Sequence, residues 1–311
     1  MKYKLTYCIL CMATMLLVSS CFTGVENTPK ITDKDVSRTI NELERRQPTM
    51  TLTTYRDSLP SWREGKRFYV TDDNVKLIFT QVAGDNMDSV KLVGRILSYK
   101  GYDTSLGLDG RDVVDIHLAD GSDEYVYHTG KTEGEFLSTF SIPLLIDMDV
   151  VEHVSRQLEG KEVYIKTPIW YNIDGEYMIH GRQYIKVHID EVLPGNKVLP
   201  LRVLFTASDN KEKAFVWMSA GQNAINNRDY DSMFSSKDLH GSYPEISGSH
   251  WEMIKRGEVE TGMTKEECRL AKGAPKKISR MPDQTAVREF WYYDGGSYLQ
   301  FVDGLLKNFR K

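Results

Sequence analysis

The chain has 311 residues, and its 40 lysines and arginines stand against 44 aspartates and glutamates, which gives a formal net charge of −4 at pH 7. This length allows two or three domains of ordinary size, and the lack of any basic run or patch argues against a nucleic-acid partner. Aromatic residues make up 11% of the chain and include 17 tyrosines. This composition favours β-rich domains, because aromatic side chains fit a pleated surface.

The N-terminus carries a secretory pattern that ends in a cysteine. Lys2 and Lys4 form a positive region, Leu5–Val18 is apolar, and Val18–Ser20 brings small residues up to Cys21. A secretory signal ordinarily ends in a small-x-small cleavage site. The apolar run is also shorter than the roughly twenty residues that cross a bilayer as a helix. The segment resembles the lipobox of bacterial lipoproteins, in which the cysteine receives diacylglycerol, the chain is cut before it, and the new amino group is acylated.

This resemblance implies a signal peptide over residues 1–20 and an anchor in a membrane through lipidated Cys21. Several acyl chains hold a protein firmly, so a triacylated, palmitate-bearing Cys21 would be a stable anchor. Phe22 is not the aspartate that favours inner-membrane retention in the best-known lipoprotein sorting system, which points to the outer membrane of a bacterial cell envelope, on its periplasmic or surface face. A plain secretory signal and a transmembrane anchor remain alternatives.

Cysteine usage predicts no disulfide. Cys8 and Cys11 belong to the signal, Cys21 would be acylated, and Cys268 is left without a partner. Cys268 lies on the apolar side of a predicted short helix, where a buried and inert thiol is expected rather than a reactive one.

After Cys21 the chain reads as a solvated tether over residues 22–31. Apolar residues then recur at helical spacing between Asp33 and Pro48, which predicts a short amphipathic helix that Pro48 ends. The tether and helix together span residues 21–58.

Residues 59–133 form a predicted β-rich unit in which the apolar period changes to two. Its expected strands are Arg67–Val70, Val75–Phe79, Val90–Val93 with Ile96 and Leu97, Val113–Leu118, and Tyr125–Tyr127. Ala119–Ser122 joins the last two as a hairpin turn. Residues 134–158 follow as a partly helical connector, with Val150, Val151 and Val154 on its apolar face.

The pattern then repeats in a second β-rich unit over residues 159–221. Glu64–Val70 is echoed by Glu159–Ile165, and Asp112–Gly130 is echoed by Leu201–Gly221. These echoes favour a tandem repeat of two small barrels, either SH3-like or OB-like, although such short motifs also recur by chance. Residues 222–249 are rich in Asn, Ser, Gly and Asp and are predicted to be a linker.

The last sixty residues alternate helix and strand signals. A short helix is expected over Trp251–Gly257, and Thr264 with Glu267 forms a capping box for a second helix that Gly273 closes. The strands that follow are expected at Lys277–Arg280, Val287–Tyr293 and Tyr298–Phe301, and Asp303–Gly304 turns into a further short strand that ends near Phe309.

This C-terminal pattern resembles the SmpA/OmlA (BamE-like) family of small lipoprotein domains. The matching positions are Gly257, Gly262, Met263, Thr264, Gly273, Pro275, Trp291, Tyr292, Phe301, Asp303 and Gly304. The resemblance implies that residues 250–311 fold as two helices on a three-stranded antiparallel sheet, a layout shared with the β-lactamase-inhibitor-protein fold, whose known members bind other proteins. The best-known family member is an accessory subunit of the outer-membrane barrel-assembly machine. Here the domain lies far from its anchor along the chain, and no matched position is catalytic.

Few residues suggest catalytic or metal chemistry. His117 and His128 could face each other across a hairpin with Asp115 or Glu124 nearby, but two exposed strand histidines are the simpler interpretation. The glycines of Gly101–Gly110 lack a phosphate-loop lysine. We therefore predict no catalytic residue, no metal and no cofactor.

One aromatic cluster is a candidate binding surface, because Tyr and Trp join a large apolar area to a polar edge. It consists of Trp170, Tyr171, Tyr177 and Trp217. The alternative is that these side chains fill the interior of a barrel.

These expectations describe an α+β protein with a β-rich middle and a BamE-like C-terminal domain. They favour a non-enzymatic envelope lipoprotein that acts as a protein-interaction or assembly and scaffold factor, with an envelope protein as partner. A glycan- or peptidoglycan-binding lipoprotein is the first alternative, since SH3-like barrels have that role in cell walls. An enzyme with an unrecognised site is the second.

Overall fold

The computed structural model describes residues 52–83, 87, 90–136, 140–175, 177–221, 228–282 and 287–310. The chain divides into two units, Met1–Pro48 and Thr49–Lys311, and all described residues belong to the second. The predicted signal peptide, Cys21 and the amphipathic helix before Pro48 lie outside the described residues. In the described residues no helix is long and apolar enough to span a membrane. This part of the molecule is mostly β, with three antiparallel sheets and few helices.

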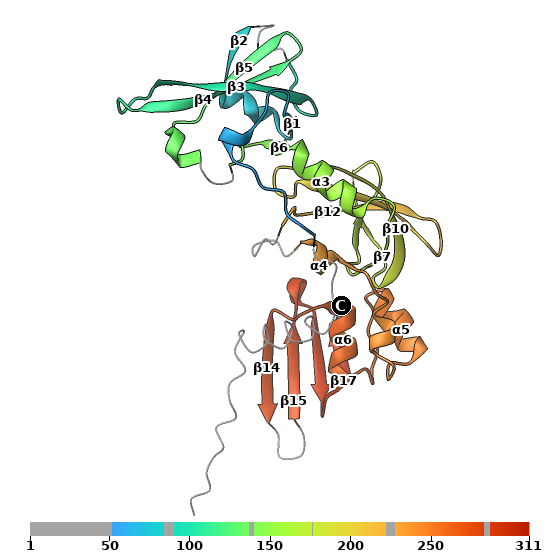
Figure 1. Ribbon diagram of the computed structural model, residues 1–311. Coiled ribbons are helices and arrows are strands. Elements are labelled where there is room, and N and C mark those ends of the chain that lie inside the picture. Colours follow the sequence, from blue (N-terminus) through green and yellow to red (C-terminus); the bar gives the residue numbers. More distant parts are fainter. Residues whose placement is uncertain are drawn as a thin grey trace, which may run out of the picture. The chain divides into compact units, whose positions relative to one another are not determined.

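The first sheet has six strands in the order β2-β5-β4-β3-β1-β6 (Figure 1). The strands are β1 (Arg67–Val70), β2 (Phe79–Ala83), β3 (Ile96–Leu106), β4 (Asp112–Asp120), β5 (Asp123–His128) and β6 (Leu145–Asp147). Short 3₁₀ turns lie at Leu59–Ser61, Asp73–Leu77 and Glu133–Phe136. Alternate residues of the strands point inward, so Phe68, Leu97, Ile116 and Tyr125 share one buried core with Trp62.

Helix α3 (Met148–Leu158) follows β6 directly. The carboxylate of Asp147 caps it by accepting a hydrogen bond of 2.9 Å from the Asp149 N–H. Val151, Val154 and Leu158 recur on one side of the helix and are buried in the core of the second sheet. The helix predicted within residues 134–158 is therefore confirmed in its second half.

The second sheet has seven strands in the order β13-β7-β10-β11-β12-β8-β9. The strands are β7 (Glu162–Ile165), β8 (Ile169–Tyr171), β9 (Met178–His180), β10 (Ile185–Pro194), β11 (Leu201–Ala207), β12 (Lys213–Met218) and β13 (Phe234–Ser235), with the short helix α4 (Tyr230–Met233) before β13. The inward side of β11, which includes Leu201, Val203 and Phe205, belongs to the second core together with the buried residues of α3.

The two sheets share one connection pattern. If β9 is set aside, β1 to β6 correspond in chain order to β7, β8, β10, β11, β12 and β13, and the spatial order of the strands is the same in both sheets. The Gly65 N–H donates to the Tyr99 carbonyl at 2.8 Å, and the Gly160 N–H donates to the Ile189 carbonyl at 2.9 Å. A register shift follows directly after Tyr99 in β3 and after Ile189 in β10. The echoed segments of the sequence thus occupy equivalent strands.

Two predicted strands of the first unit are wrong. Val75–Phe79 was expected to be extended, but residues Asp73–Leu77 form a 3₁₀ turn, and only Phe79 begins a strand. The cause is local, because the Asp72 carboxylate accepts a hydrogen bond of 2.9 Å from the Asn74 N–H and so caps a turn. Short polar side chains that bond to nearby backbone favour turns over strands.

Val90–Val93 does not form a strand either. The N–H groups of Leu92 and Val93 donate to one carboxylate oxygen of Asp73, at 2.9 and 2.8 Å. Those donors are therefore satisfied by a side chain instead of a neighbouring strand, and β3 begins only at Ile96.

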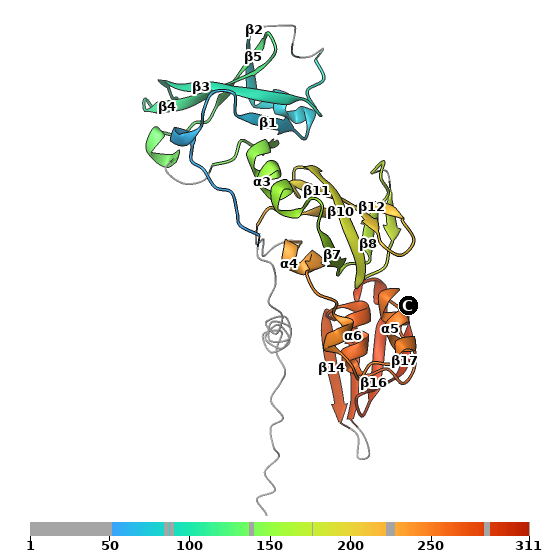
Figure 2. The same cartoon turned by 45° about the vertical axis from the view of Figure 1, so that its right-hand side comes forward.

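The third sheet has four strands in the order β14-β15-β16-β17. They are β14 (Lys277–Pro282), β15 (Val287–Tyr292), β16 (Tyr298–Val302) and β17 (Leu305–Arg310), and the helices α5 (Gly248–Lys255) and α6 (Lys265–Lys272) precede them. Both helices cover one face of this sheet (Figure 2), where Trp251, Ile254 and Cys268 pack against Trp291 and Phe301. The family resemblance implies three strands, and the fourth is the short strand expected after the Asp303–Gly304 turn.

The capping box of α6 is confirmed. The Thr264 hydroxyl accepts from the Glu267 N–H at 3.2 Å, and the Thr264 N–H donates to the Glu267 carboxylate at 2.6 Å.

The segment predicted to be a linker differs from that prediction. Its described part, residues 228–249, contains α4 and β13, and Phe234 is fully buried in the second core. Leu239 and Ile246 are buried in the third core, so apolar residues fix this segment despite its polar composition.

Candidate functional site

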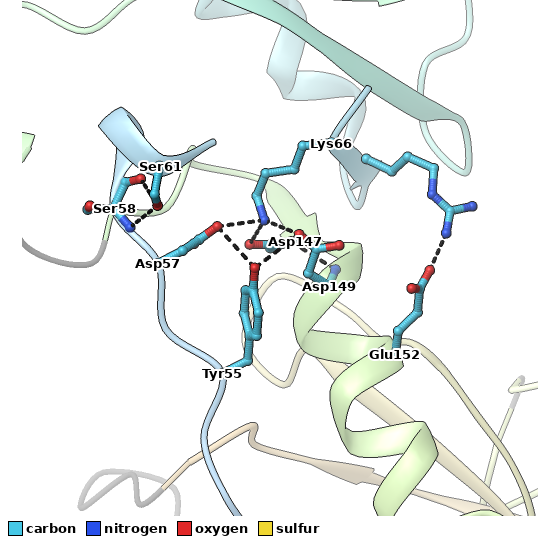
Figure 3. A network of polar contacts seen from close by, with 9 residues as sticks. Tyr55, Asp57, Ser58, Ser61, Lys66, Asp147, Asp149 and Glu152 are labelled. Atoms are coloured by element: carbon cyan, nitrogen blue, oxygen red, sulfur yellow. Dashed lines mark hydrogen bonds and ion pairs between the residues drawn. The ribbon is translucent and has the colours of Figure 1, made fainter. Parts of the chain in front are cut away.

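A polar cluster with three ion pairs surrounds Lys66 (Figure 3). Only 3% of the Lys66 side chain is exposed, and its Nζ lies 3.0 Å from Asp57 Oδ2, 2.8 Å from Asp147 Oδ2 and 2.5 Å from Asp149 Oδ2. The Tyr55 hydroxyl lies 3.3 Å from carboxylate oxygens of both Asp57 and Asp149, and it can donate its one proton to either. We call these five residues the Lys66 cluster.

The Lys66 cluster joins three segments that are far apart in the sequence. Tyr55 and Asp57 come from the extended segment that precedes the first sheet, and Lys66 lies directly before β1. Asp147 ends β6 and caps α3, and Asp149 lies in the first turn of that helix. The cluster therefore ties the incoming chain to the first sheet and to α3.

Burial and hydrogen bonds shift the pKa values of Lys66, Asp147 and Tyr55 in definite directions. Burial by itself lowers the pKa of Lys66, but hydrogen bonds to Asp147 and Asp149 outweigh it, and the net pKa is raised. Burial raises the pKa of Asp147 against the opposing effect of Lys66. Burial is also the main reason that the pKa of Tyr55 is raised to about 12.

Carboxylate oxygens of Asp57, Asp147 and Asp149 lie within 4.8 Å of one another, as the oxygen ligands of a divalent cation do. The Lys66 ammonium, however, stands within 3.0 Å of all three and already supplies positive charge to them. A buried charge is tolerated when it is paired and hydrogen-bonded. The arrangement is therefore suited to clamp the chain rather than to receive a metal ion.

The segment that carries Tyr55 and Asp57 is held at further points. The Thr53 N–H donates to Gln157 Oε1 at 2.9 Å, and the Thr53 hydroxyl lies 2.9 Å from His153 Nε2, both on α3. Leu52 packs against the second core, whereas Leu59 is buried in the first. We call Leu52–Ser58 the strap, because it runs along α3 between the two β-rich units.

Trp170 is not part of a binding surface, so for this residue the binding-surface prediction is wrong and the alternative, an interior position, holds. Its side chain is fully buried in the second core, and its indole N–H donates to the Thr167 carbonyl at 2.8 Å. The ring of Phe205 meets it edge-on, with 5.0 Å between centroids. Gly181 lies so close that a Cβ there would stand 2.0 Å from the indole ring. Trp170 lies on the face of β8 that the core covers, and its neighbours Ile169 and Tyr171 lie on the other face.

Tyr171 and Trp217 lie on the other face of the second sheet and are brought together there. Both contact Phe215, with ring centroids 5.3 and 4.8 Å away, and the Arg202 guanidinium lies 4.1 Å above the Phe215 ring. Tyr171 and Trp217 are half-buried, whereas Tyr177, in the turn after β8, is 60% exposed. Three of the four predicted residues are thus outside the core.

A second aromatic surface was missed by the sequence reasoning. Strand residues of the third sheet alternate between the face that α5 and α6 cover and an outer face. The outer face carries Phe290, Tyr292, Tyr298 and Val302, all half-buried, and none of them packs against a core of the described residues. We call this the outer aromatic face. Its signal in the sequence is the run Phe290–Tyr293, in which Trp291 is buried and its neighbours Phe290 and Tyr292 lie on the other face.

Two minor candidates are settled by the geometry. The Cys268 thiol is fully buried, and burial raises its pKa to about 12, so it is an inert core residue as predicted. His117 and His128 do not face each other, because the register pairs His128 with Asp115 and His117 with Val126. His128 Nδ1 lies 2.8 Å from the Asp115 carboxylate.

Comparison with known proteins gives no relative. No family model, no curated protein and no solved structure matches this chain.

Proposed function

We propose that this protein is a lipid-anchored protein of a bacterial cell envelope that binds another protein and acts as an assembly or scaffold factor without catalysis. Cys21 would attach it to the membrane, and the folded part would present a binding surface. The support for the anchor is the order of a positive region, an apolar run, small residues and Cys21 in the sequence.

The outer aromatic face is the observation that carries the binding role. A solvent-facing sheet surface with three aromatic side chains and a valine costs little conformational entropy when it is covered, because these side chains have few rotatable bonds. Tyrosine is enriched at the energetic centres of protein interfaces. The opposite face of the same sheet is already filled by α5 and α6, so the outer face is the one left for a partner.

The strap gives the proposed anchor a mechanical link to the fold. The chain that leaves the tether reaches the described residues at Leu52 and is bound to α3 through Thr53 and to Lys66 through Asp57. A clamp at this point would hold the chain that follows the proposed tether on both β-rich units. It supports a positional mechanism, in which the membrane attachment keeps the folded part at the membrane.

Glycan binding through the second sheet is the weaker alternative. Its predicted platform loses Trp170, which is fully buried, and Phe215 between Tyr171 and Trp217 is fully buried too. Only Tyr177 among the predicted aromatic residues exposes most of its side chain. Two half-buried rings offer a sugar less stacking area than the outer aromatic face offers a protein.

The test is crosslinking and purification of the full-length lipidated protein from envelope membranes. Wild type and a Tyr177→Ala control are expected to recover the same defined protein, whereas a Tyr292→Ala/Tyr298→Ala variant should lose it while keeping the wild-type thermal melting curve. Recovery of murein alone, from all three proteins, would contradict the proposal. A Cys21→Ser variant should lose incorporation of a labelled fatty acid and leave the membrane fraction.

A further inference from the structure

We infer that the outer aromatic face binds a short, extended and acidic polypeptide segment, with carboxylates on either side of apolar residues. This inference rests on the proposed function and adds the chemistry and spacing of the partner segment. It is carried by one row of side chains that crosses all four strands of the third sheet.

The row follows from the strand register. Lys277 on β14 is opposite Tyr292 on β15, Tyr292 is opposite Tyr298 on β16, and Tyr298 is opposite Arg310 on β17. The row therefore reads cation, aromatic, aromatic, cation. The Lys277 Nζ lies 6.0 Å from the centre of the Tyr292 ring, and Phe290 lies nearly parallel to Tyr292 at 6.4 Å.

The charge of the outer face has one sign. Lys277 and Arg310 are exposed, as is Arg288, which also alternates onto this face. Among the strand residues of this face that the structure describes, none is an aspartate or a glutamate. Two carboxylates in the adjoining turns are engaged, Asp294 with Lys276 and Asp303 with the Val287 N–H at 3.2 Å. Charge complementarity therefore selects an acidic partner.

The spacing of the two terminal cations selects an extended segment. Neighbouring strands lie about 4.8 Å apart, so the outer strands of a four-stranded row are separated by about 14 Å. An extended chain advances about 3.4 Å per residue and points every second side chain to the same side. Two carboxylates four residues apart would therefore reach Lys277 and Arg310 from one side of the segment, and an apolar residue midway would cover the tyrosines.

The size of the face suits a short segment. Strands of five to six residues are about 18 Å long, and the row is about 14 Å wide. The resulting patch of about 250 Å² is well below the roughly 800 Å² that each partner contributes to a stable globular interface. A peptide segment of a partner fits the outer aromatic face, and a flat domain surface would need contacts beyond it.

The experiment uses the full mature chain, residues 21–311, with Cys21→Ser so that no acyl chain binds lipid. Three fluorescein-labelled extended peptides of equal length are titrated by anisotropy. One carries two glutamates four residues apart around a phenylalanine, one has lysines in place of the glutamates, and one has the glutamates adjacent. We expect the first to bind at least tenfold more tightly than the lysine peptide and several-fold more tightly than the third, with affinity falling as salt screens the charges.

Variants locate the site. Lys277→Glu/Arg310→Glu should weaken binding of the spaced glutamate peptide at least tenfold and make the lysine peptide the better ligand, with an unchanged melting curve. Lys213→Glu/Lys237→Glu changes two exposed cations elsewhere and should leave both affinities unchanged. Equal binding of the glutamate and lysine peptides would overturn the inference.

Vesicles of phosphatidylglycerol provide the competing anionic probe. Vesicle binding that disappears in Lys277→Glu/Arg310→Glu, together with no binding of any peptide, would show that the face recognises an anionic membrane and would overturn the inference. The envelope purification separates this failure from that of the proposed function. If it recovers a protein through Tyr292 and Tyr298 while the peptides show no charge preference, the proposed function stands and the acidic-segment inference is wrong.

Discussion

Two buried ion clusters in this protein are mirror images in charge. In the Lys66 cluster one ammonium is surrounded by three carboxylates, whereas in the C-terminal module one carboxylate, Glu289, is surrounded by Lys265 at 2.9 Å, Arg280 at 2.6 Å and the Trp291 indole N–H at 2.6 Å. Both central groups are only 3% exposed. We call the second the Glu289 cluster.

The difference between them is what they connect. The Glu289 cluster joins α6 to two neighbouring strands within one module, and its cations are about one-third to one-half exposed. The Lys66 cluster joins the strap, β1 and α3, and two of its carboxylates are less than one-fifth exposed. Loss of the central charge should therefore lower the free energy of unfolding more in the Lys66 cluster, whose partners are less accessible to water.

The largest effect is expected for Lys66→Met. Three carboxylates would be left together without a cation, and removal of one partner from a buried ion pair typically costs about 3 kcal/mol or more. Urea unfolding should show a loss of this size in the free energy of unfolding, against a negligible change for the exposed control Lys213→Met. A loss no larger than that of the control would show that the cluster is not a clamp.

A smaller loss, about 1–2 kcal/mol, is expected for Glu289→Gln. The amide oxygen can still accept the Trp291 N–H bond, and Lys265 and Arg280 can be solvated by water. Glu245→Gln, at an exposed position, is the matched control. If Glu289→Gln destabilised the protein more than Lys66→Met does, the comparison between the two clusters would be reversed.

Acid should loosen the C-terminal module. Burial by itself raises the pKa of Glu289, but hydrogen bonds from Trp291, Lys265 and Arg280 outweigh it, and the net pKa is lowered. The pKa of Glu267 is lowered in the same way by hydrogen bonds from Thr264 and His250. A carboxyl group whose pKa is lower in the folded than in the unfolded chain stabilises the fold at pH values above its unfolded-state pKa. This stabilisation is lost as the pH falls below about 4.3.

The pKa of Asp147 is shifted in the opposite direction, because burial raises it, and protonation of Asp147 in acid does not remove stability.

The buried thiol of Cys268 reports on the C-terminal module. Its reaction with a dithiodipyridine reagent should be several-fold faster at pH 3.5 than at pH 6 after correction for the intrinsic reactivity of an unfolded control peptide. A corrected rate that is the same at both pH values would contradict the claim that ionised Glu289 and Glu267 stabilise the C-terminal module.

The smallest effect is expected for Thr53→Val in the strap. This change removes the hydroxyl contacts with His153 and Gln157, which are exposed, and should cost about 0.5 kcal/mol. Proteolysis near the strap should nevertheless become faster while the melting temperature barely moves. Proteolysis as slow as in wild type would mean that the Lys66 cluster alone holds the strap.

Local features of the fold were predictable from the sequence. The capping box at Thr264 and the turn at Asp303–Gly304 depend on residues within a few positions of one another and lie where the pattern placed them. The apolar side of α3 was predicted in part, because Val151 and Val154 are buried but Leu158 takes the place expected for Val150. Val75–Phe79 failed because Asp72 and Asp73 take backbone N–H groups that a strand would have used. Period-two alternation cannot reveal such side-chain competition.

The sites were less predictable, because they depend on contacts between distant segments. The Lys66 cluster joins residues spread over ninety positions of the chain, from Asp57 to Asp147, and no local sequence pattern predicts that they meet. Trp170 was a candidate surface residue because Tyr and Trp favour interfaces, with a barrel interior as the alternative, and residue type alone does not say which face of a strand the core covers. The outer aromatic face could not be predicted, because it depends on α5 and α6 covering the opposite side of the third sheet.

The most direct test of the central claim is site-specific photocrosslinking in envelope membranes. A benzoylphenylalanine is placed at Gln300, between the tyrosines and Val302 on the outer aromatic face, or at Lys213 as an exposed control on the second sheet. The account predicts one defined protein adduct from position 300, none from position 213, and a crosslinked segment that carries carboxylates four residues apart. Equal crosslinking from both positions, or no protein adduct from position 300, would contradict the claim that this face binds the partner.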